Sequence, residues 1–326
     1  MNKYRLSEQI RPVELTLNGQ HLRLRLRQII ACRDFADVRA GDSGGWVDSD
    51  TCLSQHGTSW IYDQNSLIFN GASIRDNARI LGPCQIYNGA IVTDSCCIEN
   101  SEIGDRAQIS HQAGIHYSRV RGACQIRDNA RVLNGSHIQA VAGLTASDCQ
   151  QLRVADQATV SASRVVHQAQ VCGHAIVNHG FIEHRARIFD HAIIDGNVRN
   201  NVWVCDSAQV YGRARIVAGN GEDEIPTLRY STRVYDSALV IGNCVLCHHV
   251  QICGHATLNG GPLQLDNHVV VCGYARVTGN VFIEGDVQIG ESACVEAFDG
   301  DSLHLQGSKI IAGEQHITRS SFPGVY

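Results

Sequence analysis

A six-residue unit repeats over most of the sequence, and this period constrains the fold more than any other feature. From residue 72, a small residue, a variable residue and an aliphatic residue recur every six positions. The first pairs are Ala72/Ile74, Ala78/Ile80, Cys84/Ile86, Ala90/Val92 and Cys96/Ile98. Because the two members of a pair are two residues apart, both point to the same face of an extended strand. Turn-forming dipeptides, such as Asp76-Asn77, separate the triplets. Each unit therefore predicts a short strand and a corner.

Some steps between aliphatic positions are five residues long, as from Val160 to Val165 and from Val177 to Ile182. A 6-6-5 pattern predicts a three-sided coil of roughly 17 residues. Such coils stack at about 4.8 Å and pair their backbone groups with the coils above and below. With this register we expect Val165, Ile182 and position 199 to stack in one column.

The composition agrees with a narrow β interior and excludes several partners. The chain is 44% hydrophobic but only 6% aromatic, with 31 glycines and one methionine. Its net charge is -5 without a basic run, which argues against nucleic-acid binding. The N-terminus lacks an apolar secretory segment, and no stretch has the length of a membrane span. We therefore expect a cytoplasmic protein that does not bind membranes.

The chain has 14 cysteines with a single C-x-x-C spacing, Cys244/Cys247, whose members would point to opposite faces of a strand, which favours reduced thiols over zinc ribbons or redox sites. Four of them replace alanine at inward positions, where we expect small buried side chains: Cys84, Cys96, Cys124 and Cys244. Five follow an inward aliphatic residue and should face outward: Cys172, Cys205, Cys247, Cys253 and Cys272. Packing against a partner and thiol reactivity both remain open for these five.

The ends of the chain predict caps. Residues 13–30 alternate as strands around Asn18-Gly19, a hairpin signal, and a solenoid needs its first coil covered. We assign 1–58 to an N-terminal hairpin and capping segment, 59–297 to the solenoid, and 298–326 to a C-terminal cap. External loops are expected where the period is interrupted, near 139–153, 217–233 and 259–269.

The segment G-D-S-G-G at residues 41–45 looks like the surroundings of a serine-protease nucleophile. Only His21 precedes Ser43, on the predicted hairpin, and a catalytic triad needs a converging histidine and acid. We predict instead that Gly41, Gly44 and Gly45 supply positive φ angles, with Trp46 covering the interior.

Units such as I-R-D-N-A-R, V-C-G-H-A-I and V-Y-D-S-A-L resemble those of the hexapeptide-repeat acyltransferases. The segments F-A-D-V-R-A-G-D-S-G-G-W-V and L-S-Q-H-G-T-S-W-I-Y-D are closer still to the YdcK-like acetyltransferases of enterobacteria. The resemblance implies an all-β fold, a single-stranded left-handed parallel β-helix with three-sided coils and a small β cap at the N-terminus. It also implies acetyl-CoA or another acyl-CoA as donor, a hydroxyl or amine of a small molecule or sugar as acceptor, and a trimer with sites between subunits. A dimer through an outward face remains open.

Histidines are the candidates for chemistry, since five of the 16 cluster within about a coil and a half: His167, His174, His179, His184 and His191. The 17-residue register predicts that His167 stacks on His184 and that His174 stacks on His191. A histidine that deprotonates the acceptor would suit acyl transfer, because imidazole titrates near neutral pH. Our candidates for this base are His174, His191 and His184, with His174 first.

Two alternatives remain. The γ-class carbonic anhydrases, also left-handed β-helices, are similar in using a His-x4-His pair and a third histidine on zinc. His174, His179 and His184 have that spacing, as do His111 and His116. Hexad slippage also produces such spacings, and we expect no metal. In the other alternative the histidines are corner residues of a non-catalytic solenoid that only binds or scaffolds.

Overall fold

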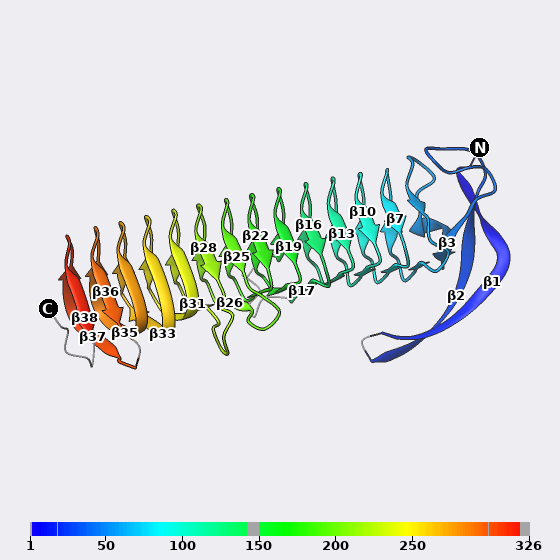
Figure 1. Ribbon diagram of the computed structural model, residues 1–326. Helices are drawn as coiled ribbons and strands as arrows, with labels where there is room; N and C mark the ends of the chain where they lie inside the picture. Colours follow the sequence, from blue (N-terminus) through cyan, green and yellow to red (C-terminus); the bar gives the residue numbers. More distant parts are fainter. Residues whose placement is uncertain (1, 18, 142–149, 299, 320–326) are drawn as a thin grey trace. The chain divides into compact units, whose positions relative to one another are not determined.

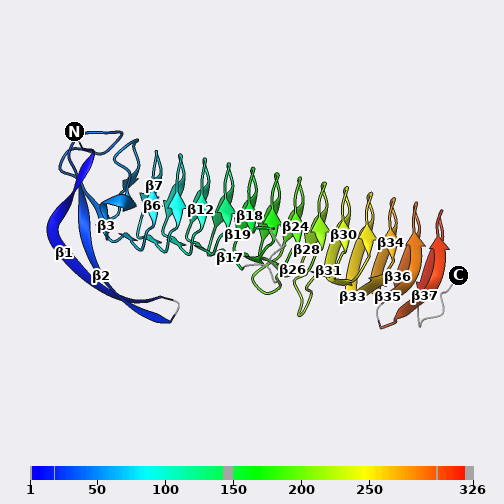
Figure 2. The same cartoon turned by 180° about the vertical axis from the view of Figure 1, so that it is seen from behind.

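The structure is a computed structural model that describes residues 2–17, 19–141, 150–298 and 300–319. The chain forms two compact units, which are considered separately. The N-terminal unit comprises 1–142 and 151–157, and the C-terminal unit comprises 143–150 and 158–326. In each unit short parallel strands stack coil on coil into a left-handed parallel β-helix, as Figures 1 and 2 show. The fold class expected from the hexads and from the family resemblance is therefore confirmed.

The N-terminal unit begins with an antiparallel hairpin, and its coils follow. Strands β1 (Tyr4–Leu17) and β2 (Gln20–Ala31) form an antiparallel pair that extends as far as Leu17, which lies opposite Gln20. Strand β2 also pairs with β3 (Ser43–Val47). A 3-10 turn, η1 (Asp50–Cys52), follows.

We name the three sides of each coil A, B and C in chain order. Side A holds β4 (Trp60–Ile61), β7 (Arg79–Leu81), β10 (Cys97–Glu99), β13 (Gly114–His116) and β16 (Arg131–Leu133). Side B holds β5 (Leu67–Ile68), β8 (Gln85–Ile86), β11 (Glu102–Ile103), β14 (Arg119–Arg121) and β17 (His137–Ala140). Side C holds β6 (Ser73–Ile74), β9 (Ile91–Val92), β12 (Gln108–Ile109), β15 (Gln125–Ile126) and β18 (Arg153–Val154).

The C-terminal unit repeats this pattern, and its later strands run around corners. Side A holds β19 (Thr159–Ser161), β22 (Ile176–Asn178), β25 (Ile193–Asp195), β28 (Arg215–Val217), β36 (Cys294–Ala297) and β38 (His316–Arg319). Side B holds β20 (Arg164–His167), β23 (Gly180–Ile182), β26 (Val202–Val204) and β29 (Thr227–Leu228). Side C holds β21 (Gln170–Val171), β24 (Arg187–Ile188), β27 (Gln209–Val210), β30 (Arg233–Val234), β32 (Gln251–Ile252) and β34 (Val270–Val271). Strands β31 (Leu239–Leu246), β33 (Thr257–Asn267), β35 (Arg276–Ile289) and β37 (Leu303–Ile311) continue from one side to the next.

The inward columns are the ones that the hexads predict. Ala175 and Ile188 are fully buried, and Val171 pairs with Ile188 in the ladder between β21 and β24. Apolar burial of this kind contributes about 25 cal/mol per Å², and the stacked backbones satisfy one another's hydrogen bonds. Each small residue leaves room for the aliphatic side chains beside it, which keeps the interior close-packed.

One predicted column is wrong beyond its second member. Val165 does pair with Ile182, but Ile182 then pairs with Val204 and not with position 199. Residues 196–201 form an extra loop that pushes the next strand, β26, further along the chain. Arg199 lies in that loop and is exposed.

The interruptions of the period have three different outcomes. Most of the expected loop at 139–153 lies outside the described residues. Near 217–233 the excursion is confined to residues 218–226, because β29 and β30 resume the coil. Near 259–269 there is no external loop: the chain continues as β33, paired on both sides, with a register shift between Gly260 and Leu263. The bulge absorbs the extra residues, so the ladder does not break.

Left-handed backbone at the corners explains why Asp, Asn and His recur there. Asp94 and His111, for example, have φ angles of 58° and 63°, a region that these residue types tolerate best after glycine. Their side chains also close the corner, because Asp94 Oδ2 accepts the His111 N–H at 2.8 Å and Asp76 Oδ2 accepts the Asp94 N–H at 3.2 Å. A corner residue thus holds the next coil by a side-chain acceptor.

The G-D-S-G-G segment forms the turn into β3 and not a nucleophile site. His21 lies opposite Thr16 near the hairpin tip, whereas Ser43 pairs with Ile30, nine residues further along β2, or about 30 Å. Gly41 has the expected positive φ of 94°. Gly44 and Gly45 do not, so that part of the prediction is wrong, and they are needed for close packing against Ile61 instead.

We expect Gly45→Ala to destabilise the N-terminal unit by about 1–3 kcal/mol, the usual cost of overpacking. An added Cβ would lie 2.4 Å from Ile61 Cγ2 and 3.0 Å from Ser66 O, and both neighbours belong to the first coil. Urea denaturation measures the change. Ser43→Ala in the same strand is the control and should leave stability unchanged; equal stability of all three proteins would contradict the packing argument.

Candidate functional site

The five clustered histidines occupy all three corners of the C-terminal unit's coils. His167 and His184 lie between sides B and C, at φ angles of 62° and 56°. His174 and His191 lie between side C and the next side A, and His179 lies between sides A and B. The two predicted stacks are present. The His167 and His184 rings are 4.9 Å apart at 7°, and the His174 and His191 rings are 4.7 Å apart at 9°.

The proposed zinc triad is not brought together within one chain. His174, His179 and His184 sit at three successive corners, separated by sides of five residues, or about 16 Å each. The five-residue spacing thus reflects one side of a coil. His111 and His116 are likewise paired with different carboxylates, Asp128 at 3.7 Å and Glu99 at 2.9 Å.

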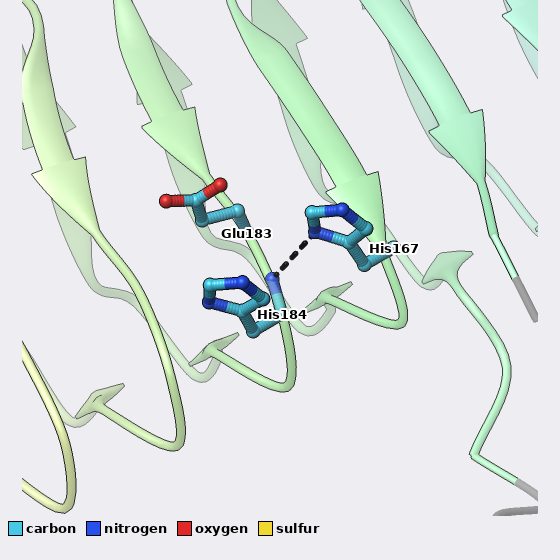
Figure 3. A group of neighbouring side chains, drawn as sticks. All are labelled: His167, Glu183 and His184. Atoms are coloured by element: carbon cyan, nitrogen blue, oxygen red, sulfur yellow. Dashed lines mark hydrogen bonds between the residues drawn. The ribbon is translucent and has the colours of Figure 1, made fainter. Parts of the chain in front are cut away.

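Around the B/C corner the structure assembles a denser group, shown in Figure 3. The His184 N–H donates to His167 Nδ1 at 3.3 Å. His167 thus accepts an N–H from the next coil, as aspartate side chains do at other corners. Glu183 is buried, and its Oε1 accepts the Trp203 indole N–H at 2.7 Å. Burial, the neighbouring His184 and the cation of Arg164 lower the pKa of His167, against an opposing effect of Glu183. The lowered pKa favours the neutral imidazole, which accepts this hydrogen bond.

His184 differs from His174 and His191 because it faces a carboxylate. Its Nδ1 lies 3.3 Å from Asp206 Oδ1, and the two side chains are about half and one-third exposed. Asp206 is itself fixed, since its Oδ2 accepts the Tyr230 N–H at 3.0 Å. A histidine beside an anchored carboxylate is the pairing that general-base catalysis needs.

Two contacts of His184 Nδ1 require different tautomers. The Asp206 N–H also points to this nitrogen, at 3.4 Å, and that contact needs a lone pair on Nδ1. The contact to Asp206 Oδ1 needs a hydrogen there. In this structure the amide contact has hydrogen-bond geometry and the carboxylate contact is an ion-pair distance, so a role for His184 as a base requires a small turn of the ring that points Nδ1–H at Asp206 Oδ1. The lone pair is then on Nε2.

Three arginines lie on the coils that carry this corner. Arg164 lies over the Phe181 ring and acts on His167, Arg185 follows His184 directly, and Arg229 lies over the Tyr230 ring. Guanidinium groups are the preferred partners of phosphate oxygens. The B/C corner therefore combines a histidine beside a carboxylate with nearby guanidinium groups.

Two loops that leave the regular coils, residues 196–201 and 218–226, lie on one corner, between sides A and B. Asn200, in the loop 196–201, donates its Nδ2 hydrogens to Gly219 O and Gly221 O, both at 2.8 Å. Asn197 Nδ2 also donates to Gly219 O at 2.8 Å. These bonds tie the loop to residues 218–226 in the next coil, so the two insertions form one projection.

A cavity in the N-terminal unit was not predicted from the sequence. It has a volume of about 450 Å³ at the A/B corner and is lined by Tyr117, Arg119, His137 and serines of successive coils. Glu102 also lines it and accepts hydrogen bonds from Tyr87, Arg119 and Arg121. Its lining residues lie 17 or 18 positions apart, for example Ser101, Ser118 and Ser136, and that interval was the available signal.

We expect Glu102→Gln to lower the unfolding free energy of the N-terminal unit by about 1–3 kcal/mol at pH 7, because charged hydrogen bonds are lost. Burial raises the pKa of Glu102, but the hydrogen bonds from Tyr87 and Arg121 outweigh it and hold that pKa below 4.5. A depressed carboxyl pKa stabilises the fold above the unfolded value and loses that effect as pH falls. The difference from the wild type should therefore shrink below pH 4.5 in urea titrations; a difference independent of pH would contradict it.

The cysteines largely follow the predicted orientation. The four inward thiols are buried, and burial raises the pKa of Cys84 to about 11 and of Cys124 to about 12. Among the outward five, Cys172, Cys253 and Cys272 are partly exposed, but Cys205 and Cys247 are buried. Cys205 is covered because its column neighbours are the long side chains of Glu183 and Arg229. It is therefore a packing residue.

Within the described part of the chain, no helix has the length and apolar character needed to cross a membrane.

The comparisons with known proteins agree with this structure. A family model described as the YdcK beta-solenoid repeat matches residues 169–185, the segment that contains His174, His179 and His184. A relative in Escherichia coli (strain K12), "Uncharacterized acetyltransferase YdcK", is 50% identical over 325 residues, which cover 100% of both chains. Identity at this level over the whole length fixes the family. The chain therefore belongs to the YdcK family of β-solenoid acetyltransferases.

Proposed function

We propose that this protein transfers an acetyl group from acetyl-CoA to a hydroxyl or amine of a small-molecule or sugar acceptor, with His184 as the general base. The observation that carries this proposal is the contact of His184 Nδ1 with the anchored carboxylate of Asp206. His174 and His191, the other candidates, stack on each other, and among the described residues no carboxylate contact is found for either.

The chemical step uses the tautomer with the hydrogen on Nδ1. His184 Nε2 removes the proton from the acceptor as its oxygen or nitrogen attacks the thioester carbonyl. The imidazolium that forms is stabilised by Asp206 through Nδ1–H. When the tetrahedral intermediate collapses, the C–S bond breaks and His184 returns the proton to the CoA thiolate. The products are the acetylated acceptor and free CoA.

The donor proposal rests on charge. Arg164, Arg185 and Arg229 lie around the His184 corner, and the phosphates of CoA need such cations. His184 is half-exposed on an outer corner, so we propose that a neighbouring subunit, in a trimer or a dimer, completes the walls of the site.

Thermal melting with CoA tests the donor. Saturating CoA should raise the melting temperature, since a ligand at 100 times its Kd stabilises by about 2.7 kcal/mol. ADP at the same concentration is the control for binding by phosphate charge alone. An unchanged melting temperature with CoA, together with no labelled acetyl transfer to a panel of sugars and amines, would refute the proposal.

A further inference from the structure

A second chemical cluster lies far along the C-terminal unit from His184, on side A of its last coils. Strands β36 and β38 are parallel neighbours, and their register places Cys294 opposite His316. Glu296 is two residues after Cys294, so its side chain lies on the same outer face. The inward residue between them, Val295, is fully buried. Register and alternation therefore bring a thiol, a carboxylate and an imidazole together on one surface.

The distances fit a metal site. One ligand atom from each of Cys294, Glu296 and His316 lies within 4.8 Å of the others, and His316 Nε2 is 3.6 Å from Glu296 Oε2. Ligand atoms around a tetrahedral zinc are about 3.3–3.8 Å apart, given metal bonds of about 2.0–2.3 Å. Small rotations of outer-face side chains would close the remaining gap.

The donor set also fits zinc. Sulfur, imidazole nitrogen and carboxylate oxygen are its three protein ligand types, and three ligands leave a fourth position for water. The thiol must lose its proton to bind. Arg276, opposite Cys294 on the other side of β36, stabilises the thiolate, whereas burial and Glu296 raise the pKa of Cys294. The Cys294 thiolate and the Glu296 carboxylate would together balance the 2+ charge of zinc, although the cation of Arg276 lies nearby.

The group His167, Glu183 and His184 meets the same distance criterion but fits a metal less well. Its imidazole planes are parallel and 4.9 Å apart, and metal bonds form in the plane of the ring, so both rings cannot face one ion. His167 Nδ1 and Glu183 Oε1 already accept hydrogen bonds.

We propose that Cys294, Glu296 and His316 form a zinc site that fastens β38 onto β36. This zinc site would stabilise two backbone hydrogen bonds between the two strands. Cys294 N–H donates to Gln315 O at 2.9 Å, and Phe298 N–H donates to Arg319 O at 3.2 Å. A bound ion would thus hold β38, the last described strand of side A, against β36.

The test uses the full-length chain, reduced and stripped with a chelator, and titrated with Zn²⁺ or Co²⁺. We expect one equivalent of zinc, and a thiolate-to-cobalt charge-transfer absorption with Co²⁺. Cys294→Ser should abolish that absorption, and Cys294→Ser, Glu296→Gln and His316→Ala should each weaken zinc binding by at least about tenfold. Cys272→Ser, another partly exposed outer thiol, should change neither.

Hydrogen exchange supplies an independent readout. Zinc should slow exchange of the Cys294 and Phe298 amides, which β38 protects, and chelation should reverse this. The proposal is overturned if the chain binds no zinc, if the three variants bind zinc as the wild type does, or if Cys272→Ser removes it equally. All three ligands are on the outer face, so we expect the three variants to fold. If one of them does not, zinc binding by the other two still tests the proposal.

Discussion

His184→Asn is expected to lower kcat for acetyl transfer by about 10²–10⁴, which is the usual contribution of a general base. Asparagine is the sharpest replacement because it removes the base and keeps the corner. It tolerates the left-handed φ of 56° at this position, and its side-chain oxygen can still accept the Asp206 N–H. Melting temperature should therefore stay near that of the wild type. The measurement is the initial rate of transfer from labelled acetyl-CoA.

His248→Asn is the matched control for this prediction. His248 also lies at a B/C corner with left-handed backbone, at φ 59°, and its Nδ1 also contacts a carboxylate, that of Asp266. If His184 were only a structural corner residue that contacts a carboxylate, His184→Asn and His248→Asn would have similar effects on the transfer rate. A rate for His184→Asn within about threefold of the wild type would remove His184 as the base.

Ala175→Arg should have the largest effect on stability. Ala175 is fully buried in the inward column, where a guanidinium would find no space and no counter-ion. A buried unpaired charge together with overpacking costs more than about 4 kcal/mol. We expect the C-terminal unit to lose its cooperative urea transition.

The neighbouring residue gives the comparison. Ile176 is 43% exposed on the outer face of the same strand, so Ile176→Arg should change stability by less than about 0.5 kcal/mol. Equal effects of the two arginines, or no effect of Ala175→Arg, would mean that the strand does not alternate as described.

Much of this fold could be predicted because the period acts on every coil in the same way. The alternation of small and aliphatic residues decides which face is buried, and the 17-residue step predicts the His167/His184 and His174/His191 stacks. Handedness was not available from spacing, since a right-handed coil could bury the same columns. It came from the resemblance to a family.

The errors arose where local packing or an insertion overrides the period. Gly44 and Gly45 have ordinary backbone angles, and only the position of Ile61 in the folded unit explains why they are glycines. The partner of His184 was missed for a related reason. A 17-residue step from His184 leads to Asn201, but the loop 196–201 shifts the sequence so that Asp206 stands in that place. Insertion length is not encoded in the repeat.

The central claim is that His184 and Asp206 act as one unit, and a double-mutant cycle on kcat tests it most directly. Asp206→Asn should lower the wild-type rate by about 10-fold or more and should add almost nothing to His184→Asn, because residues that act together are non-additive. Equal fold-losses from Asp206→Asn in both backgrounds would contradict the claim.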